Sequence, residues 1–429
     1  MNNNRLFFAL IISAFLGVSI SFSDFYLFHL ILIISSTIWL YQVKENDYKI
    51  NFSIILENYV PSMILIFLWY LFSLSWTPNI ELGFKYIFYL ICGLSIFLSV
   101  IYFCSNIQNL NKIFYVLSIL ICIEIAIALI ESFTLFRMPV SSYSSIASFL
   151  GKEPVNFSEF DNIFIYSRVR PPTGFRWNTN DLAICMIIAL PFFLCSKKTS
   201  VKVFGILSIT TIVIMTASRA VFLSLILVYT LYLLLIKKRM GTLSLIWTIS
   251  LFIFWSMSQL SESENPRINE LANSVDALIL YLSGDIDLGG SLEWRRELVD
   301  NGLKAFFNSY GLGLGAGGSA ANQEIIGPVA GRFTSMHNFW IELLVEGGLF
   351  VAILILIWIL RIIYRLFVIS RTSTDLYIAY YSKSLFLSMA AFIPAAVAAS
   401  STIYFFPMWI LFGFTVSVIS LSHEKSILK

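Results

Sequence analysis

The stretch YIFYLICGLSIFLSVIYF, Tyr86–Phe103, decides the class of fold. It carries no charged side chain over a length close to the roughly 20 residues that a helix needs to cross a bilayer. Such a segment must be helical in lipid, because hydrocarbon offers an open backbone no hydrogen-bond partners. The whole chain of 429 residues is 58% hydrophobic and 12% charged, whereas soluble domains are about 25% charged. The sequence therefore predicts an integral membrane protein and excludes a water-soluble globule.

Counting similar apolar runs outward from this stretch predicts about twelve transmembrane helices in an all-α fold. The runs are Phe7–Phe22, Phe25–Tyr41, Val60–Trp76, Tyr86–Phe103, Ile113–Phe133, Leu182–Cys195, Val201–Ala217, Ala220–Ile236, Leu243–Met257, one centred on Leu349–Leu360, Leu385–Ala398 and Tyr404–Ile419. The first run lacks a clear cleavage site, so we expect it to be retained as an anchor.

Two connections are long, and they divide the chain into five regions. These are helices 1–5 within residues 1–133, a first external loop at 134–181, helices 6–9 within 182–258, a large external loop with an amphipathic helix at 259–337, and helices 10–12 within 338–429. The large loop thus falls between spans 9 and 10. We expect the chemistry outside the bilayer in these two loops.

The basic residues of the short connections all fall on one side in this topology. Because positive charge stays inside, that side and both termini are predicted to be cytoplasmic, and both long loops external. The cytoplasmic side then carries eleven Lys and five Arg, and the outer side nine Arg and three Lys. Arginine suits bidentate contact with phosphate, so the outer arginines are candidate anion ligands. The alternative is an ordinary solvated loop surface.

A cluster of three outer arginines and one single outer arginine lie directly before predicted helices. Arg168, Arg170 and Arg176 lie in SRVRPPTGFRWNTND, residues 167–181, where prolines and a glycine suppress regular helix before the sixth span. Arg219 lies in a tight turn between the seventh and eighth spans. A positive helix end beside guanidinium groups suits an anion. The alternatives are anchoring to lipid headgroups and, for Arg219, snorkelling to the interface.

A third pair, Arg295 and Arg296, opens the amphipathic helix of the large loop. Adjacent helical positions diverge by about 100°, so the two side chains cannot point the same way. We expect one to pair with a carboxylate and the other to be the candidate ligand. The sequence does not decide which.

Three further patterns indicate structure rather than chemistry. The segment GLGLGAGG, residues 311–318, fails the context of a nucleotide-binding loop and is predicted to be a flexible turn after the amphipathic helix. Asp285 and Asp287 resemble a metal motif of nucleotide-sugar transferases, but on the outer side a polar turn is expected. The cysteines lie within or at the ends of apolar runs, so neither a disulfide nor a metal site is predicted.

His337 is the only histidine on the predicted outer side, and it opens a helix that carries Asn338, Glu342 and Glu346 on one stripe. An imidazole titrates near neutrality and can accept a proton from a hydroxyl. The alternative is a capping or surface histidine. Glu124, in the middle of the fifth span, is costly in lipid and favours a rival class, a proton-coupled transporter.

The chain resembles the O-antigen ligase/polymerase superfamily, the Wzy-type polymerases and WaaL-like ligases. The resemblance rests on RPPTGF at 170–175, SRA at 218–220, EWR at 293–295, the glycines at 313 and 315, HN at 337–338, and Glu342, Glu346 and GG at 347–348. It covers about residues 168–360.

The resemblance implies a metal-independent, cofactor-free glycosyltransferase on the outer face of the bacterial inner membrane. Its donor and acceptor would be glycans linked to undecaprenyl diphosphate, with membrane lipids, a chain-length regulator and a flippase as further partners and no nucleic acid. Arg219 and one arginine of 295/296 would hold the diphosphate, Arg170 or Arg176 would take the first-loop anion position, and His337 would activate the acceptor with Asn338 and Glu342 in support. Direct displacement would invert the anomeric centre. A polymerase is favoured, with a ligase that transfers glycan to lipid A-core as the alternative, and a glycan transporter as the rival from another class.

Overall fold

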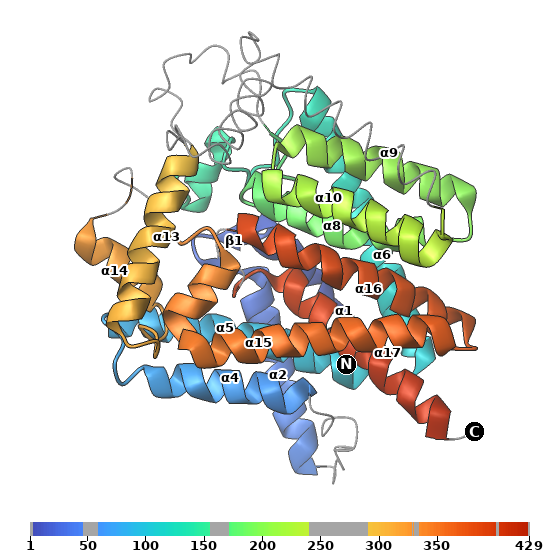
Figure 1. Cartoon of the computed structure of the whole chain (residues 1–429), viewed down its shortest axis with the longest axis horizontal. Coiled ribbons are helices and arrows are strands. Elements are labelled where there is room, and N and C mark those ends of the chain that lie inside the picture. The colour runs from blue at the N-terminus through green and yellow to red at the C-terminus, as the bar shows by residue number, and fades with distance from the viewer. Residues whose placement is uncertain are drawn as a thin grey trace.

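A computed structural model describes residues 3–45, 59–154, 171–239, 291–327, 329, 334–399 and 403–427. This part of the chain is helical apart from loops and one short hairpin, which confirms the predicted all-α class (Figure 1). In the hairpin, β1 (Ser21–Phe22) pairs antiparallel with β2 (Phe25–Tyr26). The helical elements are α1 Asn3–Leu16, η1 Gly17–Ser19, α2 Leu27–Glu45, α4 Tyr59–Ser73, α5 Ile80–Phe103, α6 Ile107–Phe133, η2 Ser145–Leu150, α8 Thr179–Leu194, α9 Thr199–Thr216, α10 Arg219–Leu231, the π-helical turn η4 Tyr232–Lys237, α13 Ser291–Asn308, α14 Gly318–Ile326, α15 Phe339–Thr372, α16 Leu376–Ala395, η5 Ala396–Ala398 and α17 Phe406–Ile427.

Within the described ranges, seven helical segments are long and apolar enough to cross a membrane, which defines a multi-pass membrane protein. They are Ile80–Phe103, Ile107–Phe133, Thr199–Thr216, Arg219–Lys237, Phe339–Thr372, Leu376–Ala398 and Phe406–His423. Four shorter apolar helices accompany them at Arg5–Ser19, Leu27–Ile38, Tyr59–Ser73 and Thr179–Leu194. The predicted ninth span, Leu243–Met257, lies outside the described residues, so the count of twelve stays a prediction.

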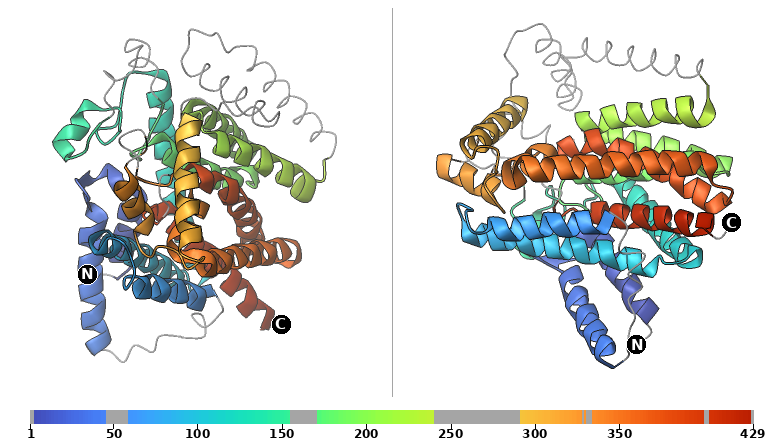
Figure 2. Two further views of the ribbon diagram at one scale, coloured as in Figure 1. Left: turned by 60° about the vertical axis from the view of Figure 1, so that its left-hand side comes forward. Right: turned by 60° about the horizontal axis from the view of Figure 1, so that its bottom comes forward.

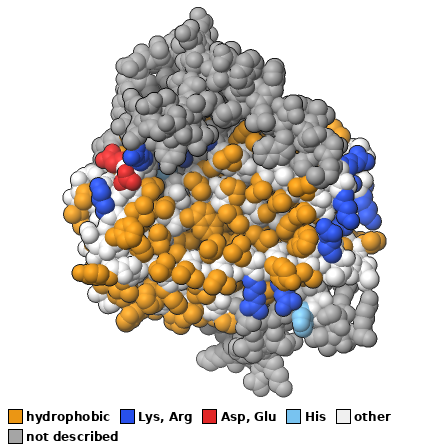
Figure 3. Space-filling view, in the orientation of Figure 1, with side chains coloured by type: hydrophobic (Ala, Val, Ile, Leu, Met, Phe, Trp, Pro, Cys, Tyr) orange, Lys and Arg blue, Asp and Glu red, His pale blue; other side chains and the backbone are white. Residues whose placement is uncertain are grey.

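The long helices run side by side, and α13 crosses one end of the bundle beside α14 (Figures 1 and 2). Helix α16 packs against α15, α8 and α10, and α17 packs against α5. Hydrophobic side chains cover the middle of one face, with Lys and Arg gathered toward its margins (Figure 3). This distribution is the one expected of a bundle whose middle faces lipid.

Among the described residues, the basic connections at the ends of α5, α8, η4 and α15 meet at one end of the bundle, which we call the lysine end. There the guanidinium of Arg371 donates to the carbonyl of Leu235 at 3.0 Å. The hydroxyl of Tyr381, near the start of α16, donates to Asn111 Oδ1 near the start of α6 at 2.6 Å. Helices α13 and α14 lie at the opposite end, which we call the loop end (Figure 1).

Helix α15 is longer than its apolar pattern predicts. The sequence pointed to a span centred on Leu349–Leu360, whereas the helix runs from Phe339 to Thr372 with a kink at Gly348. Gly348 has φ 71° and ψ −174°, a conformation that a residue with a Cβ rarely adopts. The kink separates a short first segment, which carries Glu342 and Glu346, from the long apolar segment.

Candidate active site

Helix α13 separates the two arginines that the sequence left undecided. Arg296 is exposed and its Nε lies 3.7 Å from Asp300 Oδ2, one turn further along the helix. Arg295 is half-buried, and its positive charge acts on His337. Arg296 thus pairs with a carboxylate, and Arg295 is the arginine whose charge acts on the histidine.

The inner face of α13 is anchored to the start of α15. Phe306 of α13 forms a buried cluster with Met336 and Val345. Helix α14 supports α13 from the other side, because Gln323 Nε2 donates to the carbonyl of Leu298 at 3.3 Å. Burying side chains of this size contributes roughly 1.5–3 kcal/mol each, which holds Arg295 on a fixed helix beside His337.

His337 occupies a strained and partly desolvated position. Its φ of 47° lies in the left-handed region, which is uncommon for a residue other than glycine and often marks a functional site. Burial lowers its pKa to about 4, and the positive charge of Arg295 adds to this shift. The imidazole is therefore neutral at neutral pH, which is the form that can accept a proton.

Asn338 fixes the start of the helix that follows the histidine. Its Oδ1 accepts hydrogen bonds from the backbone N–H groups of Trp340 at 3.1 Å and Ile341 at 3.4 Å. This is an N-cap, which satisfies donors that the first helical turn leaves open. The amide oxygen of Asn338 is thus used to hold α15, and its role at the site is to position His337.

Two carboxylates lie beneath the histidine on the first segment of α15. Glu342 is 2% exposed and Glu346 is fully buried. The hydroxyl of Ser319 donates to Glu346 Oε1 at 2.6 Å. Helix α14 has no side-chain cap of its own at Gly317, so Glu346 supplies a hydrogen-bond acceptor to the first turn of this helix. The sequence grouped Glu342 and Glu346, but gave no signal for Ser319.

The glycine-rich segment does follow α13 as a turn, but it is packed against backbone rather than loosely held. Leu314 N–H donates to the carbonyl of Val345 at 2.7 Å, and Gly315 N–H to that of Glu346 at 3.0 Å. A Cβ on Gly313 would lie 2.5 Å from the backbone nitrogen of Gly348. Trp76 Nε1 donates to the carbonyl of Gly313 at 3.1 Å. The segment therefore fastens the kink of α15 to α4 and the turn that follows it.

Arg176 lies apart from this group, inside the bundle. Its Nε is 2.9 Å from Glu124 Oε1 and its Nη2 is 3.0 Å from Glu124 Oε2. Nη1 donates to the carbonyl of Phe15 at 2.7 Å. Arg176 is 4% exposed and Glu124 fully buried. This guanidinium is committed to the protein interior, so we do not include Arg176 in the proposed diphosphate site.

A second carboxylate of α6 holds the same stretch of the first loop. Glu131 Oε2 accepts from the backbone N–H groups of Thr173 and Gly174, both at 2.7 Å, and its Oε1 accepts from Met138 N–H at 2.9 Å. Glu124 and Glu131 are seven residues apart and therefore share one face of α6. Both intramembrane carboxylates thus bind the segment Pro171–Arg176. Sequence reasoning did not anticipate this pairing.

Of the remaining candidate arginines, Arg219 lies in the described part of the chain. Arg219 is half-buried at the first position of α10, after Ala217, whose φ of 53° turns the chain. Helices α10 and α15 both contact η5, and the indole of Trp340 in α15 donates to the carbonyl of Ile393 at 2.9 Å. Arg219 therefore starts a helix at the end of the bundle that also holds His337. Arg168 and Arg170 lie outside the described residues, as do Asp285 and Asp287.

Together, fold and site define a multi-pass helical membrane protein with a histidine and an arginine coupled at one end of its bundle. Residues 204–356 match the family model for O-antigen ligase. The chain is 21% identical over 441 residues to the teichuronic acid biosynthesis protein TuaE of Bacillus subtilis, covering 95% of this chain and 81% of that protein. It is 28% identical over 265 residues to the ComP-specific O-oligosaccharyltransferase of Acinetobacter baylyi, covering 57% of this chain and 45% of that protein. The predicted resemblance to the O-antigen ligase superfamily is confirmed.

Proposed function

We propose that this protein is a membrane glycosyltransferase that polymerises oligosaccharide repeat units carried on undecaprenyl diphosphate. The observation that carries the proposal is the packing of α13, through Phe306, against Met336 and Val345 at the loop end, which brings Arg295 to the side of His337. The segment that matches the O-antigen ligase family model, 204–356, contains both residues and Arg219. The similarity to proteins named for teichuronic acid biosynthesis and for oligosaccharyl transfer supports a lipid-linked glycan as substrate.

In the proposed reaction, the acceptor hydroxyl oxygen bonds to the anomeric carbon of the donor as the bond from that carbon to the diphosphate oxygen breaks. The hydroxyl proton passes to the imidazole of His337, and undecaprenyl diphosphate leaves. Arg295 and Arg219 would stabilise the negative charge that develops on the leaving group, without a metal ion. Attack opposite the leaving group inverts the anomeric centre.

The charge of Arg295 makes the basicity of His337 depend on whether the donor is bound. In the free protein, Arg295 contributes to the lowered pKa of His337. A bound diphosphate would neutralise that charge and raise the basicity of the imidazole, because a nearby anion favours the protonated form. The base would therefore become stronger when the donor is in place.

The external location of the site remains part of the proposal. It follows from the positive-inside rule, because the basic short connections meet at the end of the bundle opposite α13. The outer face lacks nucleotide sugars, and a glycosyl diphosphate on a lipid carries its own leaving group.

A ligase that transfers the finished glycan to lipid A-core or another acceptor is the second candidate, favoured by the match to the O-antigen ligase model itself. The transporter alternative rested on Glu124, and that carboxylate is paired with Arg176 in the interior. A deletion strain separates the first two candidates. Loss of a polymerase leaves single repeat units, whereas loss of a ligase leaves long glycan on undecaprenyl diphosphate.

The test of the site is to replace His337 with Ala and, separately, Arg219 with Ala. We expect His337→Ala to lower glycan transfer by about 10²–10⁴-fold, the range for loss of a positioned general base. Glycan length is read on a gel and protein abundance in the membrane fraction. Normal glycan from the His337 variant at normal abundance would remove the histidine from the mechanism, and normal glycan from the Arg219 variant would remove Arg219 from the site.

A further inference from the structure

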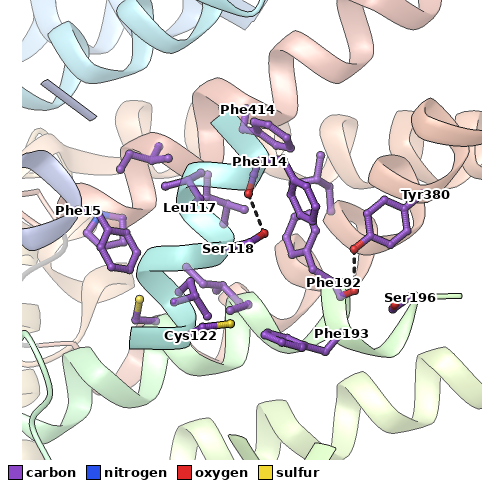
Figure 4. A pocket seen from close by; sticks show the side chains of 18 of the residues that line it. Phe15, Phe114, Leu117, Ser118, Cys122, Phe192, Phe193, Ser196, Tyr380 and Phe414 are labelled. Carbon is purple, nitrogen blue, oxygen red and sulfur yellow. Dashed lines mark hydrogen bonds between the residues drawn. The ribbon is translucent and has the colours of Figure 1, made fainter. Parts of the chain in front are cut away.

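A cavity of about 310 Å³ lies between α1, α6, α8, α9, α16 and α17, and Figure 4 shows it from close by. Phe114, Phe192, Phe193 and Phe414 are among the residues that line it. It is separate from the candidate active site, since none of its lining residues belongs to α13, α14 or α15.

Two hydroxyl groups of the cavity wall already donate hydrogen bonds to backbone carbonyls of the protein. The hydroxyl of Ser118 donates to the carbonyl of Phe114 at 2.7 Å, and the hydroxyl of Tyr380 to that of Phe192 at 2.7 Å (Figure 4). Water would gain few hydrogen bonds in such a space, and apolar cavities of this kind stay dry or take apolar ligands. The interior therefore suits a hydrocarbon chain.

The cavity has access to the lipid-facing surface of the bundle. Cys122 of α6 lines it and is exposed. Its neighbours Ile119 and Ile123 are also exposed, at 43% and 44%. Because this surface belongs to a helix that is apolar enough to cross a membrane, the molecules that meet it are lipids.

Cations gather where the cavity approaches the lysine end. Lys197 and Lys198 directly follow Ser196, and Lys202 follows Val201, and both Ser196 and Val201 line the cavity.

Cys195, the residue before Ser196, reports the same positive charge. The positive charges of Lys383, Lys202 and Lys237 all act on its thiol. Among the described side chains, that of Asp375 is acidic and also lies near this end, where it caps α16. The surroundings of the cavity are thus net positive, which complements an anionic headgroup.

We propose that this cavity binds a hydrocarbon chain of an anionic phospholipid, whose headgroup is held by the lysines of the lysine end. The lipid carrier of a glycan donor fits these lysines less well than an anionic phospholipid does. Its diphosphate belongs with Arg295 and His337 at the loop end, whereas these cations lie at the other end of the bundle. The lipid would brace α6, α8, α9 and α16 against one another independently of glycan transfer.

The first test fills the cavity. Ala189 lines it and is 8% exposed, so Ala189→Phe places a ring inside, while Ala126→Phe adds the same ring on the exposed side of α6 as a matched control. The full chain is purified in detergent, supplied with phosphatidylglycerol or phosphatidylcholine, and examined by native mass spectrometry. We expect the wild type and Ala126→Phe to retain phosphatidylglycerol, and Ala189→Phe to retain about tenfold less, equivalent to 1.4 kcal/mol.

The second test removes the cations and does not depend on whether Ala189→Phe folds. In Lys198→Ala/Lys202→Ala, the preference for phosphatidylglycerol over phosphatidylcholine should disappear, while Lys304→Ala, an exposed lysine of α13, should leave it unchanged. Equal retention of phosphatidylglycerol by the two phenylalanine variants would overturn the proposal. So would an unchanged preference in the double lysine variant, or displacement of the phospholipid by undecaprenyl phosphate.

Discussion

The two arginine sites of the protein place the same side chain in opposite situations. Arg176 is buried between α6 and the end of the first loop, where Glu124 neutralises it and Phe15 stacks on it, with the guanidinium 4.8 Å from the ring centroid. Arg295 is half-buried on α13, where it lies near a histidine whose pKa it helps to lower.

This contrast separates a structural arginine from a candidate ligand. A buried charge must be paired, because desolvating it alone is costly, and a fully paired guanidinium has little left to offer a substrate. At the Arg295 site the neighbouring histidine has a left-handed backbone, and burial and the charge of Arg295 lower its pKa, so this positive charge lies where it could attract a bound anion. The predictions below test this division, from the largest expected effect to the smallest.

Breaking the buried pair should have the largest effect, on stability. Arg176→Ala leaves the Glu124 carboxylate buried without its partner, and we expect a loss of about 3–5 kcal/mol in the free energy of unfolding. Thermal unfolding of the purified protein and abundance in the membrane measure it. The double variant Glu124→Leu/Arg176→Met should recover most of the loss, because no charge remains to be desolvated. A stable but inactive Arg176→Ala would move this arginine into the site and contradict the contrast.

Removing Arg295 should act on transfer instead. We expect Arg295→Ala to lower the transfer rate by about 100-fold, because a preorganised group that stabilises developing negative charge is lost. Protein abundance should stay near that of the wild type. The rate is measured with purified protein and a lipid-diphosphate-linked repeat unit. A fall in abundance equal to the fall in glycan would assign Arg295 a structural role like that of Arg176.

The dependence of kcat/KM on pH tests whether the charge of Arg295 lowers the pKa of His337. The imidazole accepts a proton only when neutral, so with a pKa of about 4 in the free protein the acid limb of kcat/KM should lie well below the ordinary histidine range. In Arg295→Ala this limb should move to higher pH, because one of the two causes of the shift is gone while burial remains. Profiles of kcat/KM against pH test this, and identical limbs in both proteins would disprove the coupling.

The same shift has a consequence for stability. Because the pKa of His337 is lower in the folded chain than in the unfolded chain, the unfolded state binds more protons between about pH 4 and pH 6.5. The contribution of His337 to the free energy of unfolding is therefore fully present above pH 6.5 and is lost as the pH falls toward 4.

Arg296 provides the smallest expected effect and the control for its neighbour. The side chains of Arg296 and Asp300 are 46% and 52% exposed, and ion pairs between exposed side chains contribute little to the free energy of unfolding. Arg296→Ala should change the free energy of unfolding by less than about 1 kcal/mol and leave glycan transfer near the wild-type level. A loss of transfer as large as that of Arg295→Ala would mean that both guanidinium groups serve the site.

Much of the architecture was predictable because a bilayer selects continuous apolar segments. Each predicted span within the described residues contains a helix, and the amphipathic helix of the large loop is present as α13. The facing ends of the first two predicted spans were wrong, since Ser21–Phe22 and Phe25–Tyr26 form the hairpin. The early start of α15 was missed, since its first segment carries Glu342 and Glu346 and does not read as a span. That segment is helical because Asn338 caps it and the glycine-rich turn packs on its backbone.

The sequence alone determined the class of the protein, the placement of its apolar helices and the division of its charges between two ends, since these depend on transfer from water to lipid. Only the tertiary structure decided where the arginine side chains lie. Arg176 and Glu124 are 52 positions apart, and no local pattern shows that they meet. Arg295 and Arg296 are adjacent, yet their directions differ by about 100° on a helix, so the packing of α13 against α15 determines which of them faces His337.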